Sequence, residues 1–88
     1  MATTTIPIPE LKIETVRIPE EILVRCTGRI TSISADTLKT TIRRLIWESK
    51  RVVLDLTDVN YMDGSGLGAL VGVYLSAARQ NCEMRIII

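Results

Sequence analysis

Residues 52–56, Val-Val-Leu-Asp-Leu, set narrow limits on the architecture of this chain. A short run of β-branched and other apolar residues is typical of a strand that is buried on both faces, as in a parallel sheet. Parallel neighbours cannot be joined by a tight turn, so each connection needs a crossover, usually a helix. The run therefore predicts an α/β fold with helical segments on either side of it.

The segment before this run has helical periodicity. Its apolar residues recur at helical spacing and are Ala35, Leu38, Ile42, Leu45 and Ile46. Lys39, Arg43 and Arg44 fall mostly outside that stripe, as expected for a solvent-exposed face. Ser34 or Asp36 is the candidate N-cap, and the helix is predicted to stop near residues 48–50.

A second helix is predicted to begin near Gly64 and to end at residues 80–81. Its apolar residues on one face are Leu67, Leu70, Val71, Tyr74 and Ala78. Gly68 and Gly72 lie inside this helix, where each costs about 1 kcal/mol relative to Ala. We expect a packing gain to offset that cost, because a slim helix can approach the sheet closely.

The remaining segments predict strands and loops. Residues 11–16 alternate and suit a first strand at a sheet edge, and residues 22–27 suit a second strand that ends at Gly28. The two are close in sequence and are expected to form an antiparallel hairpin. Residues 57–63 are interpreted as a polar loop, and residues 84–88 as a last strand. The predicted order is β-β-α-β-α-β, a small mixed sheet with helices on one face.

Composition excludes several classes of function. The chain has 88 residues, a net charge of +1 and only three aromatic side chains, so it lacks the basic surface that nucleic acid requires. Cys26 and Cys82 belong to no Cys-x-x-Cys pair and are interpreted as free thiols in a reducing compartment. No secretory signal and no apolar run of about 20 residues is present, so we expect a cytoplasmic protein without direct membrane insertion.

Residues 63–68, Asp-Gly-Ser-Gly-Leu-Gly, join the buried strand to the second helix. Asp63 suits the N-cap, where its carboxylate accepts free N–H groups of the first turn. Gly64 and Gly66 leave Ser65 uncrowded, so its hydroxyl is expected to be exposed in that turn. A helix N-terminus favours negative charge, so the fold would accept a phosphate on Ser65.

The same loop fails the tests for three kinds of enzyme. A Ser-His-Asp triad is impossible because the chain contains no histidine. In the nucleophile-elbow pattern, Asp63 and Leu67 occupy the glycine positions. A phosphate-binding P-loop needs Gly-Lys-Ser/Thr after the glycines, and that is missing. No catalytic residue is therefore expected.

Cofactor and metal sites are also not expected. Gly64-x-Gly66-x-x-Ala69 matches a loose dinucleotide fingerprint, but the glycines do not follow the strand directly and no second half exists to hold the cofactor. Acidic residues gather near one end of the predicted sheet, where turn and capping roles explain them. These residues are Asp55, Asp58 and Asp63.

Residues 52–70, VVLDLTDVNYMDGSGLGAL, resemble STAS domains, and among these the bacterial anti-sigma factor antagonists most. The resemblance extends over about residues 11–88 and leaves residues 1–10, which are rich in Thr and Pro, as an extended tail. It implies that Ser65 accepts a phosphate, with Asp63 as the acidic residue before it. It also implies that the unphosphorylated module binds an anti-sigma factor of the serine kinase type, that phosphorylation abolishes this binding, and that a serine phosphatase restores it.

The resemblance also suggests which residues contact the partner, namely Asp63, Gly64, Ser65, Gly66, Leu67 and Thr31. Thr31 stands where family members often carry Asp, and Gly64 replaces a common first serine. These departures leave two alternatives open, a scaffold subunit of the stressosome type and a cytosolic STAS subunit of a membrane transporter.

The last predicted strand, at residues 84–88, has a further consequence. Family domains usually continue with at least one more helix, so one face of this strand is expected to be uncovered and apolar. We expect a partner, a second copy in a homodimer, or a domain-swapped element to cover it. Alternatively, the chain is a fragment of a longer one.

Overall fold

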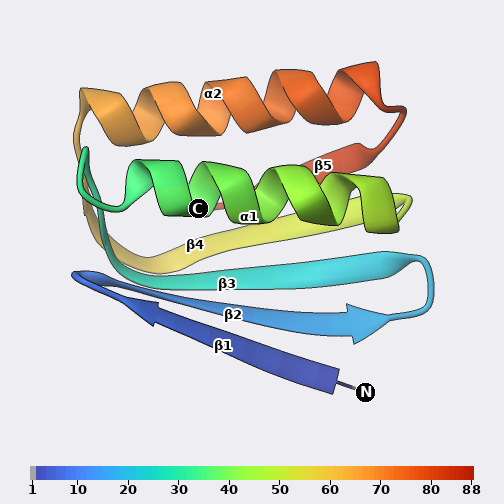
Figure 1. The fold of residues 1–88 in the computed structure, drawn as a ribbon, viewed down its shortest axis with the longest axis horizontal. Helices are drawn as coiled ribbons and strands as arrows, with labels where there is room; N and C mark the ends of the chain where they lie inside the picture. Colours follow the sequence, from blue (N-terminus) through green and yellow to red (C-terminus); the bar gives the residue numbers. More distant parts are fainter. Residues whose placement is uncertain (1) are drawn as a thin grey trace.

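The computed structural model describes residues 2–88 and contains a five-stranded mixed sheet with two helices on one face (Figure 1). The elements are β1 Ala2–Ile8, β2 Leu11–Ile18, β3 Glu21–Ile30, α1 Ala35–Glu48, β4 Arg51–Met62, α2 Gly64–Arg79 and β5 Glu83–Ile87. The strands lie in the order β1-β2-β3-β4-β5. The predicted fold class, a small mixed sheet covered by helices on one side, is confirmed.

The centre of the sheet is parallel, as the apolar run at residues 52–56 predicted, but the expected burial on both faces is corrected. The helices cover one face only, so Val53 and Asp55 on the other face are half-buried. β4 pairs in parallel with β3 on one side and with β5 on the other, and α1 and α2 are the two crossovers. Val52 and Leu54 are fully buried between their neighbours and the helices. The core is built from aliphatic side chains, together with Cys26, Cys82 and Met84.

Both cysteines are free, as predicted, and both are buried. Burial, together with a smaller contribution from the nearby Asp55 carboxylate, raises the pKa of the Cys26 thiol to about 12. Burial also raises the pKa of the Cys82 thiol. A thiol held in its protonated form is a poor nucleophile, so both side chains act as small core residues.

The segment predicted to be an N-terminal tail is instead a fifth strand, so that prediction is corrected. Residues 2–8 form β1 and pair antiparallel with β2, whereas Met1 lies outside the described residues. The element order is therefore β-β-β-α-β-α-β, and β2 is an interior strand and not an edge. The prolines do not prevent a strand here, because an edge strand tolerates residues without an N–H. Ile6 and Ile8 also gain contact with the core.

The predicted polar loop at residues 57–63 is also corrected, because it is almost entirely the second half of β4. β3 does not stop at Gly28 but continues to Ile30, so it offers a partner for β4 as far as Met62. The pairing has two register shifts, between Arg25 and Thr27 and between Gly28 and Arg29, and Gly28 has a φ of +119°. Backbone pairing over the full length of β3 therefore overrides the low strand propensity of Asp58 and Asn60.

The helices end where the sequence predicted, at Glu48 and at Arg79 with Gln80 as the cap. The buried face of α2 is rotated from the expected one. Its buried residues are Gly66, Ala69, Leu70, Val73 and Ala77. Most of the apolar stripe predicted to face the sheet, including Leu67, Val71 and Tyr74, is exposed instead. Among residues 2–88, neither helix combines the length and apolarity needed to cross a bilayer.

Candidate functional site

The candidate site lies where β3 and β4 end beside each other. Ile30 and Met62 are paired across the two parallel strands, and the backbone N–H of Asp63 donates to the Ile30 carbonyl at 3.3 Å. The turns leading into α1 and α2 therefore lie next to each other at one end of the sheet (Figure 1). Parallel pairing brings together residues 31 and 63–67, which are more than thirty positions apart in sequence.

Asp63 is the N-cap of α2, as predicted. Its Oδ1 accepts the backbone N–H of Gly66 at 2.9 Å, and its carbonyl accepts that of Leu67 at 3.0 Å. Gly64, Ser65 and Gly66 are thus the first three residues of the helix. The positive end of the helix dipole lies at Ser65, where added negative charge is favourable by about 0.3–1 kcal/mol.

We predict that Asp63→Ala lowers the free energy of unfolding by about 1 kcal/mol, because the Gly66 N–H loses its acceptor. In thermal denaturation this corresponds to a fall in Tm of about 4–8 °C for a domain of this size. Asp63→Asn is the matched control, since an asparagine oxygen caps about as well as an aspartate oxygen. An equal loss of stability in Asp63→Asn would show that charge, and not capping, gives Asp63 its role in the fold.

Ser65 is exposed. The glycines near it differ in whether the fold leaves space for a side chain at their positions. A Cβ built at Gly64 or Gly68 meets no atom within 4 Å, whereas one at Gly66 would overlap the Ile30 carbonyl. Gly66 therefore permits the close approach of α2 to β3. The packing gain expected at Gly68 is absent. This helix position is exposed, and packing within the domain does not require glycine there. Open glycines around an exposed serine leave room for another backbone to approach.

Thr31 lies beside this turn but faces inward. Its side chain is buried, its hydroxyl donates to the Glu10 carboxylate at 2.5 Å, and its oxygen accepts the Ile33 N–H at 3.2 Å. Ser34 occupies the N-cap position before α1, but its side chain does not cap that helix. Its hydroxyl is 3.0 Å from the Arg29 carbonyl and 3.3 Å from Glu10 Oε2. Thr31 thus holds the turn in shape and presents no hydroxyl to a partner.

Glu10 is a site residue that no sequence pattern indicated. It lies in the β1–β2 turn with φ at +65°, and its carboxylate joins Thr31, Ser34 and Arg29. The Arg29 guanidinium also stacks on the Tyr61 ring at 4.4 Å. Since 21 positions separate Glu10 from Thr31, no local pattern could have revealed this contact.

Comparison with known proteins identifies this arrangement. The family model of the STAS domain matches residues 12–87. The chain belongs to the STAS domain family. The match begins inside β2 and ends with β5, so it includes both helix-entry turns of the candidate site.

Solved structures share the fold of this STAS domain at low sequence identity. The antisigma-factor antagonist STAS domain from Rhodobacter sphaeroides is 22% identical with a TM-score of 0.76, over 90% of this chain and 87% of that one. The anti-sigma factor antagonist SpoIIAA in its unphosphorylated form is 14% identical with a TM-score of 0.66, over 97% and 71%. Mglu is 17% identical with a TM-score of 0.76, over 82% of this chain but only 18% of that one.

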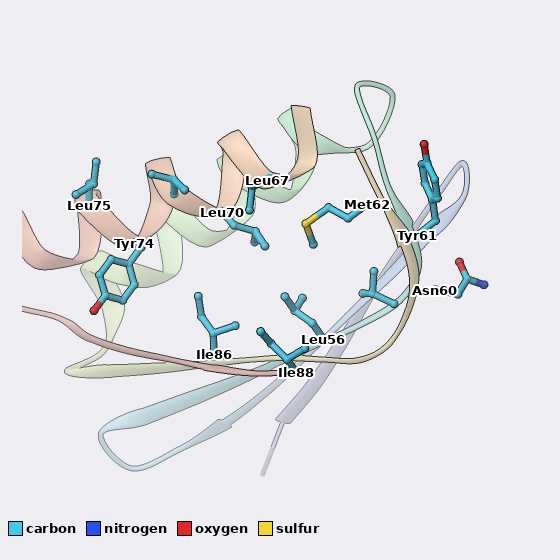
Figure 2. A pocket seen from close by; sticks show the side chains of 12 residues that line it. Leu56, Asn60, Tyr61, Met62, Leu67, Leu70, Tyr74, Leu75, Ile86 and Ile88 are labelled. Carbon is cyan, nitrogen blue, oxygen red and sulfur yellow. The ribbon is translucent and has the colours of Figure 1, made fainter. Parts of the chain in front are cut away.

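An apolar groove of about 600 Å³ adjoins the serine turn. It is lined by Leu56, Val59, Asn60, Tyr61, Met62, Leu67, Leu70, Val71, Tyr74, Leu75, Ile86 and Ile88. Figure 2 shows the side chains of Leu67, Leu70 and Tyr74 from α2 lying across from those of Ile86 and Ile88. Leu67 is 58% exposed and belongs both to the turn and to the groove. The signal in the sequence was an α2 that is apolar on more than one side, which indicates a second face to be covered.

Proposed function

We propose that this STAS domain is an anti-sigma factor antagonist whose binding is switched by phosphorylation of Ser65. The observation that carries the proposal is the exposed Ser65 hydroxyl in the first turn of α2, beside the capping carboxylate of Asp63. Membership of the STAS family and the antagonists among its structural neighbours support the same reading. The unphosphorylated form sequesters the anti-sigma factor, and the phosphorylated form releases it.

A phosphate at Ser65 would alter binding without refolding the domain. It adds about −1.5 to −2 charges at neutral pH, next to a helix N-terminus that accommodates them. At about 4 Å from a partner carboxylate, each unit pair of like charges costs roughly 1–4 kcal/mol, depending on the local dielectric. Each 1.4 kcal/mol is a tenfold loss of affinity, so electrostatic repulsion alone suffices to release the partner.

The candidate contact residues divide into two groups by accessibility. Gly64, Ser65 and Leu67 are exposed and can meet the partner directly. Gly66 and Thr31 are buried, so we assign them a positioning role, through the close approach to Ile30 and the bond to Glu10. Asp63 is half-buried and caps the helix, and its free oxygen adds negative charge beside the phosphate site.

The proposal implies two enzymes as partners and a binding role for this chain itself. The anti-sigma factor is of the serine kinase type and modifies Ser65, and a serine phosphatase reverses the modification, all in the cytoplasm. Structures of SpoIIAA in unphosphorylated and phosphorylated forms share this fold, with TM-scores of 0.66 and 0.63. That pair supports a fold that can exist with and without the phosphate.

Mass spectrometry of the protein isolated from its native cell tests the switch. We expect a phosphate on the peptide that contains Ser65 in some growth states and its absence in others, because a switch must populate both forms. Cells that carry the wild-type gene and cells that carry Ser65→Ala in its chromosomal place should differ only in the phosphorylation of this peptide. A survey of growth states without phosphorylated Ser65 would contradict the proposal.

A second candidate function, a scaffold subunit in a larger assembly, is favoured by the apolar groove between α2 and β5. Leu67, Val71, Tyr74 and Leu75 are each more than half exposed, an arrangement typical of a protein–protein interface. A large assembly in sedimentation, unaffected by Ser65→Asp, would favour this function. A monomer at working concentration would exclude it.

A further inference from the structure

Trp47, the only tryptophan of the chain, lies exposed near the C-terminal end of α1. Its side chain is 73% exposed, whereas its neighbour Ile46 is only 4% exposed and belongs to the core. Trp47 borders a small pocket of about 170 Å³ between the two helices. Arg43, Ile46, Ser76, Arg79 and Gln80 complete the lining. Trp and Arg are the residues most enriched at energetic hot spots of protein interfaces.

The charge around this pocket is positive and not neutralised within the domain. Arg43, Arg44 and Arg79 are exposed, and none of them forms an ion pair among residues 2–88. The other arginines each pair with a carboxylate, and these are Arg17, Arg25, Arg29, Arg51 and Arg85. Glu48, which follows Trp47, forms an ion pair with Arg17 at 2.8 Å, so its carboxylate is not available to neutralise the arginines at the pocket. Two of these unpaired arginines, Arg43 and Arg79, line the small pocket together with Trp47.

This surface is separate from the serine turn. Ser65 is at the beginning of α2 and Arg79 is its last residue. At 1.5 Å per residue, they are about 21 Å apart along the helix axis. A ligand in the small pocket would leave the Ser65 turn free, so the two surfaces can be occupied at the same time.

We propose that Trp47, Arg43 and Arg79 form a docking site for an acidic peptide segment that carries an apolar side chain. The apolar side chain would enter the small pocket and pack against the Trp47 ring. Carboxylates on either side of it would pair with the Arg43 and Arg79 guanidinium groups, which match planar carboxylates in geometry. Nucleic acid is the less suitable ligand, because the net charge is only +1 and single strands need several stacking aromatics.

Selection of short random peptides on the wild-type protein, with counter-selection on Trp47→Ala, tests the site. The enriched peptides are expected to place Asp or Glu next to an apolar residue. Their binding can be followed by Trp47 emission, which should shift to shorter wavelength as the ring leaves water. Trp47→Ala is expected to weaken the selected peptide about 30-fold. Circular dichroism should show that this variant folds normally, since the replaced side chain is mostly exposed.

Charge reversal provides the second measurement and its control. Arg43→Glu combined with Arg79→Glu should weaken the acidic peptide by about 100-fold. Arg25→Glu makes the same kind of charge change on β3 and should leave the affinity nearly unchanged, as should Ser65→Asp. Enriched peptides without acidic residues, equal binding by the double variant, or tighter binding of a single-stranded DNA oligonucleotide would each overturn the proposal.

Discussion

Ser65→Asp is expected to weaken binding of the anti-sigma factor at least about tenfold, and enzymatic phosphorylation about a hundredfold or more. The aspartate adds one negative charge and the phosphate nearly two, each directed at the surface that the partner must cover. The Tm should stay nearly unchanged, because the new charge lies in the first turn of α2, where the helix dipole favours it. Calorimetric titration with the partner and thermal denaturation measure the two effects separately.

Two variants serve as controls for this result. Ser65→Ala removes the acceptor hydroxyl without adding charge, so it should bind like the unmodified protein and resist release by the kinase. Thr3→Asp adds the same charge to the exposed face of β1, at the opposite edge of the sheet from β5, and should leave affinity unchanged. Equal binding by wild-type protein and Ser65→Asp would reject the switch, whereas equal loss in Thr3→Asp would indicate a nonspecific charge effect.

Gly66→Ala and Gly68→Ala are expected to change stability in opposite directions, although they lie two positions apart in the same helix. At Gly66 a methyl group would overlap the Ile30 carbonyl and lie 2.9 Å from both Ile30 Cγ2 and Met62 Cγ. Such overpacking costs about 1–3 kcal/mol, so we expect a loss of about 2 kcal/mol. At Gly68 the methyl group meets nothing within 4 Å, and alanine should stabilise the helix by up to about 1 kcal/mol.

Urea denaturation of the two variants and the wild type measures this difference, and the partner titration adds a second readout. Gly66→Ala should lose stability in the free protein. Gly68→Ala should gain stability and yet bind the anti-sigma factor more weakly, because its methyl group projects from the same side of α2 as Gly64. If Gly68→Ala gained stability and kept its full affinity, the open glycines would have no part in the interface.

Local sequence patterns were sufficient for those features that depend on nearby residues. The apolar run at residues 52–56 indicated a central parallel strand, since such strands are rich in Val, Ile and Leu, but it did not show that helices cover only one face of β4. Asp63 indicated the start of α2, because a capping carboxylate acts within three residues of its own position. The exposure of Ser65 followed from that cap and from the glycines beside it.

The tertiary structure alone decided the features that depend on distant partners. Residues 2–8 became a strand because β2 offered unpaired backbone groups, and residues 57–62 did so because β3 continues past Gly28. Periodicity could find the apolar residues of α2 but not which of them face the sheet, since that depends on how closely Gly66 approaches Ile30. Glu10 reaches the site only because the β1–β2 turn lies beside Thr31 and Ser34 in the folded domain. Apart from the β1–β2 hairpin, these contacts join groups more than 20 positions apart in sequence, and such contacts leave no mark in a local pattern.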